Sequence, residues 1–116
     1  MPRGPSGNVS FTAKISRREA AILDEERARR GLPTVSAVAE AALLETLALL
    51  ESGTAPLRRR LAGDGPSFVT TFRFDPAVLE RVRQAGRRYG LTVAYILRAA
   101  IGRLVPGAHG PTQTGT

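Results

Sequence analysis

Two short stretches of the chain alternate between apolar and polar residues. They read VSFTAKI at residues 9–15 and FVTTFRF at residues 68–74, and the second holds three of the four phenylalanines of the chain. Strict alternation is typical of a half-buried strand, because successive side chains of a strand point to opposite faces. A ribbon of two strands is marginal alone, so helices are expected to cover one of its faces.

After each predicted strand the apolar residues change to a helical spacing. Residues three and four apart form one continuous apolar stripe, which is typical of a helix that faces a core. The first stripe extends further along the chain than the second, so its helix is expected to be longer. The two stripes are Val35, Val38, Ala39, Ala42, Leu43, Leu47 and Leu50, and Val93, Ile96, Leu97, Ala100, Ile101 and Leu104.

The chain contains the same pattern twice. Ser16 precedes Gly31 by 15 residues, and Asp75 precedes Gly90 by the same 15 residues. One extra residue in the first copy, Pro33, then shifts the alignment by one. Each copy predicts a strand, a helix, a turn and a second helix. The expected organisation is a disordered arm (1–8), a first unit (9–51), a basic Gly/Pro-rich linker (52–67), a second unit (68–105) and a disordered tail (106–116).

Residues that commonly begin and end helices stand at the expected boundaries. Hydroxyl and carboxylate side chains suit the N-caps, proline suits the first turn, and glycine suits the turn that follows a helix. The N-caps are Ser16, Thr34, Asp75 and Thr92, the first-turn proline is Pro76, and the stops are Gly31 and Gly90.

The first helix of each unit has the weaker apolar pattern. In the second unit Leu79, Val82 and Tyr89 are expected to form the inner face. In the first unit Ile22 and Leu23 are followed by a run of four charged residues, so this helix is expected to lie at the surface.

The simplest arrangement pairs the two strands antiparallel within one chain, over a core of four helices. The predicted fold is therefore mostly α with a two-stranded antiparallel β-ribbon, as a tandem pseudodimer in the order β-α-α-linker-β-α-α. Alternation then divides the ribbon into two faces. The inner face is expected to hold Phe11, Ala13, Ile15, Thr70, Phe72 and Phe74, and the outer face Ser10, Thr12, Lys14, Val69, Thr71 and Arg73.

The charge is basic and unevenly placed. The 116 residues carry a net charge of +7, and 16 of the 17 basic residues are arginine. Residues 1–52 hold seven basic and seven acidic residues, whereas residues 53–116 hold ten and three. A basic surface attracts the phosphate backbone of nucleic acid whatever its sequence. Nucleic acid is therefore the first partner to consider, and the alternative is that the charge serves solubility alone.

The composition also excludes several kinds of site. The chain has no cysteine, and its single histidine, His109, lies in the segment expected to be disordered. Disulfides and cysteine-based metal sites are therefore excluded. No catalytic constellation of carboxylates, metal ligands or nucleophile with base remains once the helix faces are assigned. We expect a cytoplasmic, non-enzymatic protein with no cofactor, no membrane partner and no small-molecule substrate.

At this point the chain resembles a known family. A basic residue precedes the last apolar residue of each strand (Lys14-Ile15 and Arg73-Phe74), and the second helices begin TVSAV at residues 34–38 and TVAYI at residues 92–96. With the order strand, helix, Gly turn, helix, this pattern resembles the ribbon-helix-helix (Arc/MetJ-type) DNA-binding family. The chain is similar to tandem versions in which two units are fused, as in certain accessory proteins of conjugative plasmids.

The resemblance implies that the outer side of the ribbon enters the major groove of double-stranded DNA. The implied base-contacting residues are Ser10, Thr12, Lys14, Val69, Thr71 and Arg73. Because these positions differ between the two copies, an asymmetric site is expected rather than a palindrome. The alternative is a ribbon whose polar side faces only water.

Phosphate contacts are expected at the starts of the second helices, because a helix N-terminus offers free N–H groups and a positive dipole end. The alternative there is ordinary capping. The arginine cluster of the linker is a second candidate, for which the alternative is a solvated run of charge. The candidate phosphate-contacting residues are Thr34, Val35, Ser36, Thr92, Val93, Arg58, Arg59 and Arg60.

The favoured function is therefore a sequence-specific DNA-binding protein, most simply a transcriptional repressor. A relaxosome or plasmid-partition accessory protein would use the same surface. Leu44, Leu47 and Leu50 extend the first stripe and are expected to cover the linker or another chain. Self-association of DNA-bound chains is therefore a hypothesis. An antitoxin is less favoured because the last residues, PGAHGPTQTGT, lack apolar anchors. From a different class, a helical protein-interaction module is the more distant alternative.

Overall fold

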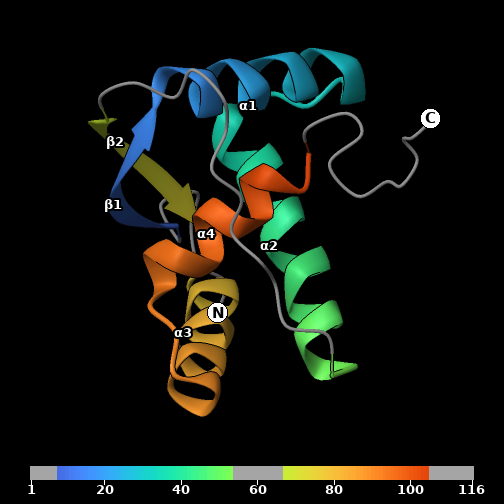
Figure 1. The fold of residues 1–116 in the computed structure, drawn as a ribbon. Coiled ribbons are helices and arrows are strands. Elements are labelled where there is room, and N and C mark those ends of the chain that lie inside the picture. The colour runs from blue at the N-terminus through green and yellow to red at the C-terminus, as the bar shows by residue number, and fades with distance from the viewer. Residues whose placement is uncertain (1–7, 54–66, 105–116) are drawn as a thin grey trace, which may run out of the picture.

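The computed structural model describes residues 8–53 and 67–104, which form two strands and four helices (Figure 1). These elements follow one another in the order β-α-α-β-α-α, so the predicted fold class is confirmed. In chain order they are β1 (Val9–Ser16), α1 (Arg17–Arg30), α2 (Val35–Glu51), β2 (Ser67–Phe74), α3 (Pro76–Tyr89) and α4 (Val93–Gly102). The predicted arm and tail and nearly all of the predicted linker lie outside the described residues.

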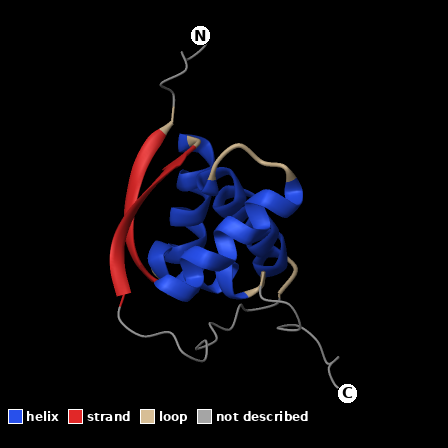
Figure 2. Ribbon diagram, turned by 90° about the horizontal axis from the view of Figure 1, so that it is seen from above, coloured by secondary structure: helices blue, strands red, loops and turns tan. Residues whose placement is uncertain are grey.

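The two strands form one antiparallel ribbon, as the alternation predicted. Val9 lies opposite Phe74 at one end, and Ser16 lies opposite Ser67 at the other. Figure 2 shows the strands side by side along one side of the helices. Phe72 and Phe74 point inward and are almost fully buried. The helices therefore cover one face of the ribbon, and no described helix covers the other.

One hydrophobic core joins both units. The stripes of α2 and α4 supply most of it, together with Ile15, Leu23, Leu79 and Val82. The rings of Phe72 and Phe74 stack on each other, with centroids 5.6 Å apart. Helix α2 packs against α4 between the two units. Burial of large apolar side chains stabilises a fold by roughly 1.5–3 kcal/mol each, so these stripes hold the two units together.

The predicted caps are present at the helix ends. Ser16 and Glu19 form a capping box, in which the Ser16 hydroxyl accepts from the Glu19 amide at 3.0 Å and the Glu19 carboxylate accepts from the Ser16 amide at 2.8 Å. Gly31 (φ 69°) and Gly90 (φ 72°) are left-handed and end the first helix of each unit. Glycine adopts this conformation without the strain that a side chain would add. The turn at Gly31 lets α2 leave α1 at 92°.

Two expectations about the first helices need correction. Tyr89 was expected to face inward, but its side chain is 39% exposed and its hydroxyl donates to the carbonyl of Leu50 at 3.2 Å. The third inner position of α3 is Gly86, where the backbone of Leu91 packs too closely to leave room for a side chain. Tyrosine suits the rim instead, because its hydroxyl finds a partner there.

Helix α1 was expected to lie at the surface, but one of its faces packs into the core. Ile22 and Leu23 are buried there, and so are the carboxylates of Glu19 and Glu26. Glu26 forms ion pairs with Arg29 and with Arg30, and Glu19 pairs with an arginine of the other unit. Sequence pattern assigns glutamate to solvent, and only its partners make burial acceptable.

No single helix among the described residues is both long and apolar enough to cross a membrane; α1 and α2 reach that length and composition only together, across their bend.

Candidate nucleic-acid interface

The six residues predicted to face outward lie together on the uncovered side of the ribbon. The register places Ser10 opposite Arg73, Thr12 opposite Thr71, and Lys14 opposite Val69. The side chains of all six residues are exposed, because the alternation of the strands directs them away from the core. The structure therefore brings all six candidate base-contacting residues onto one surface, which we call the outer ribbon face.

The centre of the outer ribbon face is neutral and its two ends are basic. The hydroxyl oxygens of Thr12 and Thr71 lie 3.3 Å apart and share a hydrogen bond. Within residues 8–53 and 67–104, neither Lys14 nor Arg73 forms an ion pair, and neither strand holds an acidic residue. Both cations are therefore free to bind an external acceptor.

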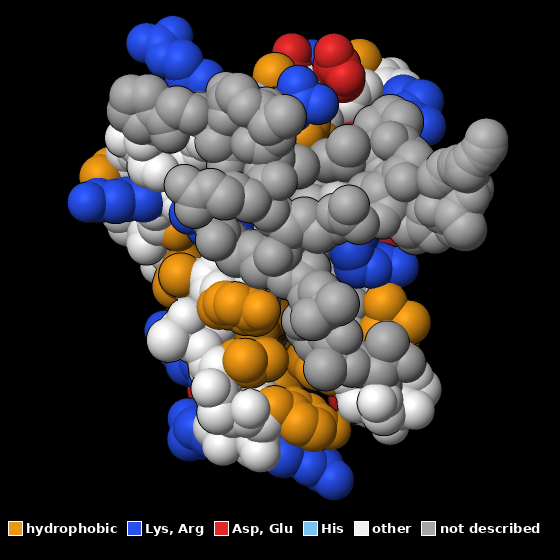
Figure 3. Space-filling view, viewed as in Figure 1, with side chains coloured by type: hydrophobic (Ala, Val, Ile, Leu, Met, Phe, Trp, Pro, Cys, Tyr) orange, Lys and Arg blue, Asp and Glu red, His pale blue; other side chains and the backbone are white. Residues whose placement is uncertain are grey.

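Basic side chains project from the side of the molecule where the ribbon lies and from above the start of α1, whereas the acidic side chains visible in the same view gather over the middle of α1 (Figure 3). In the same view other basic side chains stand beside the acidic ones over α1 and at the foot of α3, so the basic surface extends beyond the ribbon side (Figure 3).

The start of α2 lies directly beside β2. Thr34 caps the helix by accepting from the Ala37 amide at 3.1 Å, and the Ser36 hydroxyl accepts from the Arg73 amide at 2.9 Å. A groove of about 300 Å³ lies between α1, α2 and β2. Its lining includes Thr71 and the three residues of this helix start that were predicted to contact phosphate, Thr34, Val35 and Ser36. The structure thus joins this helix start to the edge of the outer ribbon face.

The start of α4 is built in a similar way. Thr92 accepts from the Tyr95 amide at 3.0 Å, and α4 packs against β1. Val93 is half-buried against the core, as is Val35 at the equivalent position of α2. Ala94 stands where the first unit has Ser36, so the side chain at this position has no hydroxyl. The predicted contacts Arg58, Arg59 and Arg60 lie outside the described residues.

Two further basic residues near the ribbon were not predicted as contacts. Arg17 and Arg18 follow β1 directly, are exposed, and pair with no carboxylate in the part of the chain that the structure describes. Cations in the first turn of a helix oppose its dipole. That local conflict is a signal that sequence reasoning could have used, because natural sequences break such rules mostly at functional sites.

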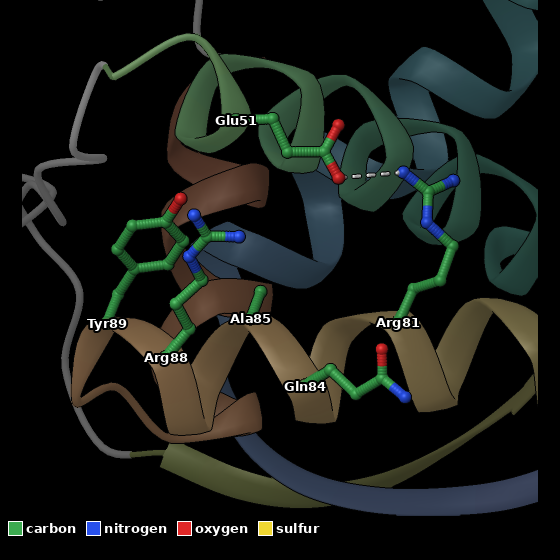
Figure 4. Close-up of a pocket in the computed structure, with 6 residues that line it drawn as sticks. All are labelled: Glu51, Arg81, Gln84, Ala85, Arg88 and Tyr89. Atoms are coloured by element: carbon green, nitrogen blue, oxygen red, sulfur yellow. Dashed lines mark hydrogen bonds and ion pairs between the residues drawn. The ribbon is translucent and has the colours of Figure 1, made fainter.

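A small cavity lies between the end of α2 and α3 (Figure 4). Its volume is about 120 Å³, and Figure 4 shows Arg81 and Glu51 reaching toward each other and Arg88 beside the ring of Tyr89. Arg81 pairs with Glu51 at 3.2 Å, and the guanidinium of Arg88 lies 5.6 Å from the centre of the Tyr89 ring. The Arg81–Glu51 pair and the hydrogen bond from Tyr89 to Leu50 tie the long α2 to the second unit.

Among the described residues, no group of three or more His, Asp or Glu side chains is placed to hold a metal ion. No protein-family model, curated protein or solved structure matches this chain. The topology and the outer ribbon face are therefore the observations on which a function can be argued.

Proposed function

We propose that this chain is a tandem ribbon-helix-helix protein that binds double-stranded DNA sequence-specifically through the outer ribbon face. The observation that carries the proposal is the composition of that face, which has small polar and basic side chains and no acidic ones. The major groove of B-DNA is about 12 Å wide and admits a two-stranded ribbon. Paired strands lie about 4.8 Å apart, which leaves room for their side chains on the groove floor.

Each outward side chain has a partner chemistry in the groove. Arg73 can donate two hydrogen bonds to O6 and N7 of guanine, and the ammonium of Lys14 can donate to a base acceptor or to a phosphate oxygen. The hydroxyls of Thr12 and Thr71 can bond to base edges, and their methyl groups can contact thymine. Val69, which is 60% exposed, offers methyl groups alone. An exposed apolar side chain at this position suits contact with a thymine methyl better than contact with water.

The helix starts on either side of the ribbon would hold the flanking phosphates. Thr34 and Thr92 cap these helices, and the remaining first-turn amides are free donors at a positive dipole end. Such contacts fix the register of the ribbon in the groove and carry no base information. The linker cluster Arg58, Arg59 and Arg60 would add contacts of the same kind.

Transcriptional repression by occlusion of a promoter is the simplest role for such a binder. A relaxosome or plasmid-partition accessory protein would use the same surface. Self-association of neighbouring chains on a long site fits either role, but Leu47 and Leu50 are buried in the core, so Leu44 alone of the three leucines is open to another chain. The genomic position of the bound site separates these roles, because a transfer origin beside relaxase genes favours the accessory role.

Selection of bound duplexes from a random library, followed by equilibrium titration of the selected site at several salt concentrations, tests the proposal. The full chain is expected to enrich one short sequence and to show a steep fall in affinity with salt. Replacement of Arg73 by alanine is expected to cost roughly 1–3 kcal/mol on the selected site and to relax preference at one base pair.

The matched control is Arg83→Ala, which removes the same charge from an exposed position on α3. It is expected to retain the sequence preference of the parent chain. If Arg73→Ala lowered the affinity for every duplex by the same factor, base reading by Arg73 would be ruled out. A parent chain that binds no duplex would overturn the proposal and leave the protein-interaction module as the better reading.

A further inference from the structure

The outer ribbon face has an approximate two-fold axis at its centre. Thr71 is the residue 59 positions after Thr12, so the two are equivalent in the repeat, and they also lie directly opposite each other. The axis that relates the two units therefore passes between them. About this axis, Ser10 is equivalent to Val69 and Lys14 to Arg73. The two ends of the face have the same layout, and only their side chains differ.

The end that holds Arg73 is suited to reading bases. Its guanidinium is a planar fork that matches the two acceptors of guanine, and Ser10 across the ribbon adds a hydroxyl. Ser36 holds the amide of Arg73 at 2.9 Å, so the strand is fixed to α2 at this residue. Groups that must recognise a base edge need such support from a neighbouring rigid element.

The end that holds Lys14 is suited to binding phosphate. The lysine ammonium is a point charge on a flexible stem, and Val69 beside it has no polar group. Ala94 has no hydroxyl to hold the strand here, as Ser36 does at the other end. Arg17 and Arg18 continue the positive charge into α1, whereas Pro76 and Ala77 stand at the equivalent places of the second unit.

Resting on the proposed function, we propose that the two ends of the ribbon have different tasks. The end with Ser10 and Arg73 makes the hydrogen bonds that read the sequence, and the end with Lys14, Arg17 and Arg18 anchors the DNA backbone, with Val69 as its one contact to a base. Ser36 is a positioning residue that acts through Arg73. The chain therefore binds an asymmetric site in one orientation only.

Two variants of the full chain test the division of tasks on the selected site and on single-base variants of it. Arg73→Ala is expected to lower discrimination at one base pair by on the order of ten- to a hundredfold, with the salt slope falling by about one contact at most. The double variant Arg17→Ala, Arg18→Ala is expected to lower the slope by about two contacts while the order of preferred sequences stays the same. If both variants changed preference and slope alike, the division would be wrong.

Ser36→Ala is expected to weaken discrimination at the same base pair as Arg73→Ala, with no change in the salt slope. Ser36→Thr, which keeps the hydroxyl, is the conservative variant and is expected to restore discrimination. Equal loss of affinity on every sequence would identify Ser36 as a phosphate contact and would remove its positioning role.

Orientation can be measured directly, because the chain has no cysteine of its own. Ala77 of α3 lies at the Arg73 end and Ala21 of α1 lies at the other end, and both side chains are exposed. The variants Ala77→Cys and Ala21→Cys therefore each place one thiol at a known end. An iron chelate attached to either cysteine is expected to cleave the DNA on one side of the site, and on opposite sides for the two attachments. If the chain bound specifically but cleaved on both sides of the site, the single orientation would be wrong and the proposed function would stand. If the chain showed no specific binding, the proposed function itself would be wrong.

Discussion

Arg98 of α4 binds the carboxylate of Glu19, which caps the first turn of α1 in the other unit. The guanidinium approaches both carboxylate oxygens at 2.8–3.0 Å, and Glu19 is only 2% exposed. The same carboxylate accepts from the Ser16 amide. One buried group thus ends β1, begins α1 and joins the two units.

On the other side of the axis, the residue equivalent to Arg98 carries the opposite charge. Glu40 occupies the place of Arg98 in α2, and its carboxylate accepts from the Asp75 amide at the start of α3 at 3.0 Å. Val78 occupies the place of Glu19, so α3 has no capping box of its own, and Glu40 supplies the missing acceptor. Two copies of the first unit would oppose Glu40 to Glu19. The interface therefore fits unlike units and disfavours a pair of first units.

Replacement of Arg98 by methionine is expected to destabilise the fold strongly. It leaves the buried Glu19 carboxylate without its cation, which typically costs about 3–5 kcal/mol. Denaturant unfolding of the full chain, with the slope checked for two-state behaviour, measures this loss.

The double variant Glu19→Gln, Arg98→Met serves as the control for that loss. Glutamine still offers an oxygen to the Ser16 amide, and no charge remains buried, so the double variant is expected to be more stable than Arg98→Met alone. The free energy of unfolding lost by the double variant is compared with the sum of the losses of Arg98→Met and Glu19→Gln, each measured alone. A double-variant loss equal to this sum would show that the two side chains do not interact in solution.

Glu40→Ala is expected to destabilise the chain by roughly 1–3 kcal/mol, because it leaves the partly buried Asp75 amide without an acceptor. Glu40→Gln keeps an oxygen at this place and is expected to recover most of the loss. Thermal unfolding of both variants measures the difference. Equal stability of the alanine and glutamine variants would show that the hydrogen bond contributes nothing.

Gly86→Ala is expected to destabilise α3 by on the order of 1–3 kcal/mol, although alanine has the higher helix propensity. A Cβ atom at this position would lie 2.5 Å from the carbonyl oxygen of Leu91. Gly102 in α4 is the matched control, since a Cβ there meets nothing within 4 Å. Gly102→Ala is expected to be neutral or stabilising by up to about 1 kcal/mol, and unfolding curves compare the two.

Replacement of Arg58, Arg59 and Arg60 by alanine is expected to reduce the salt dependence of DNA binding by up to about three phosphate contacts, with sequence preference unchanged. The measurement is the slope of log affinity against log salt concentration on the selected site. An unchanged slope would remove the cluster from the interface.

The fold was largely predictable because both units contain the same short-range sequence pattern. Alternation in residues 9–15 and 68–74 and the stripes of α2 and α4 are short-range signals, and the repeat made antiparallel pairing of the strands the simplest solution. The structure confirms the order of elements and the division of the ribbon into two faces. The six outward residues could be assigned for the same reason, since the period of a strand alone decides the side.

Burial of polar groups and the exact pairing of the strands required the folded chain. The sequence pattern placed Tyr89 in the core, and this assignment fails, while nothing in the pattern indicated that Glu19 would be buried. In each case a partner distant in sequence decides the outcome. Register is likewise a non-local property, because many offsets preserve the alternation. Only the packed structure places Thr12 against Thr71 and Ser36 against Arg73, and those two contacts define the centre and the supported end of the outer ribbon face.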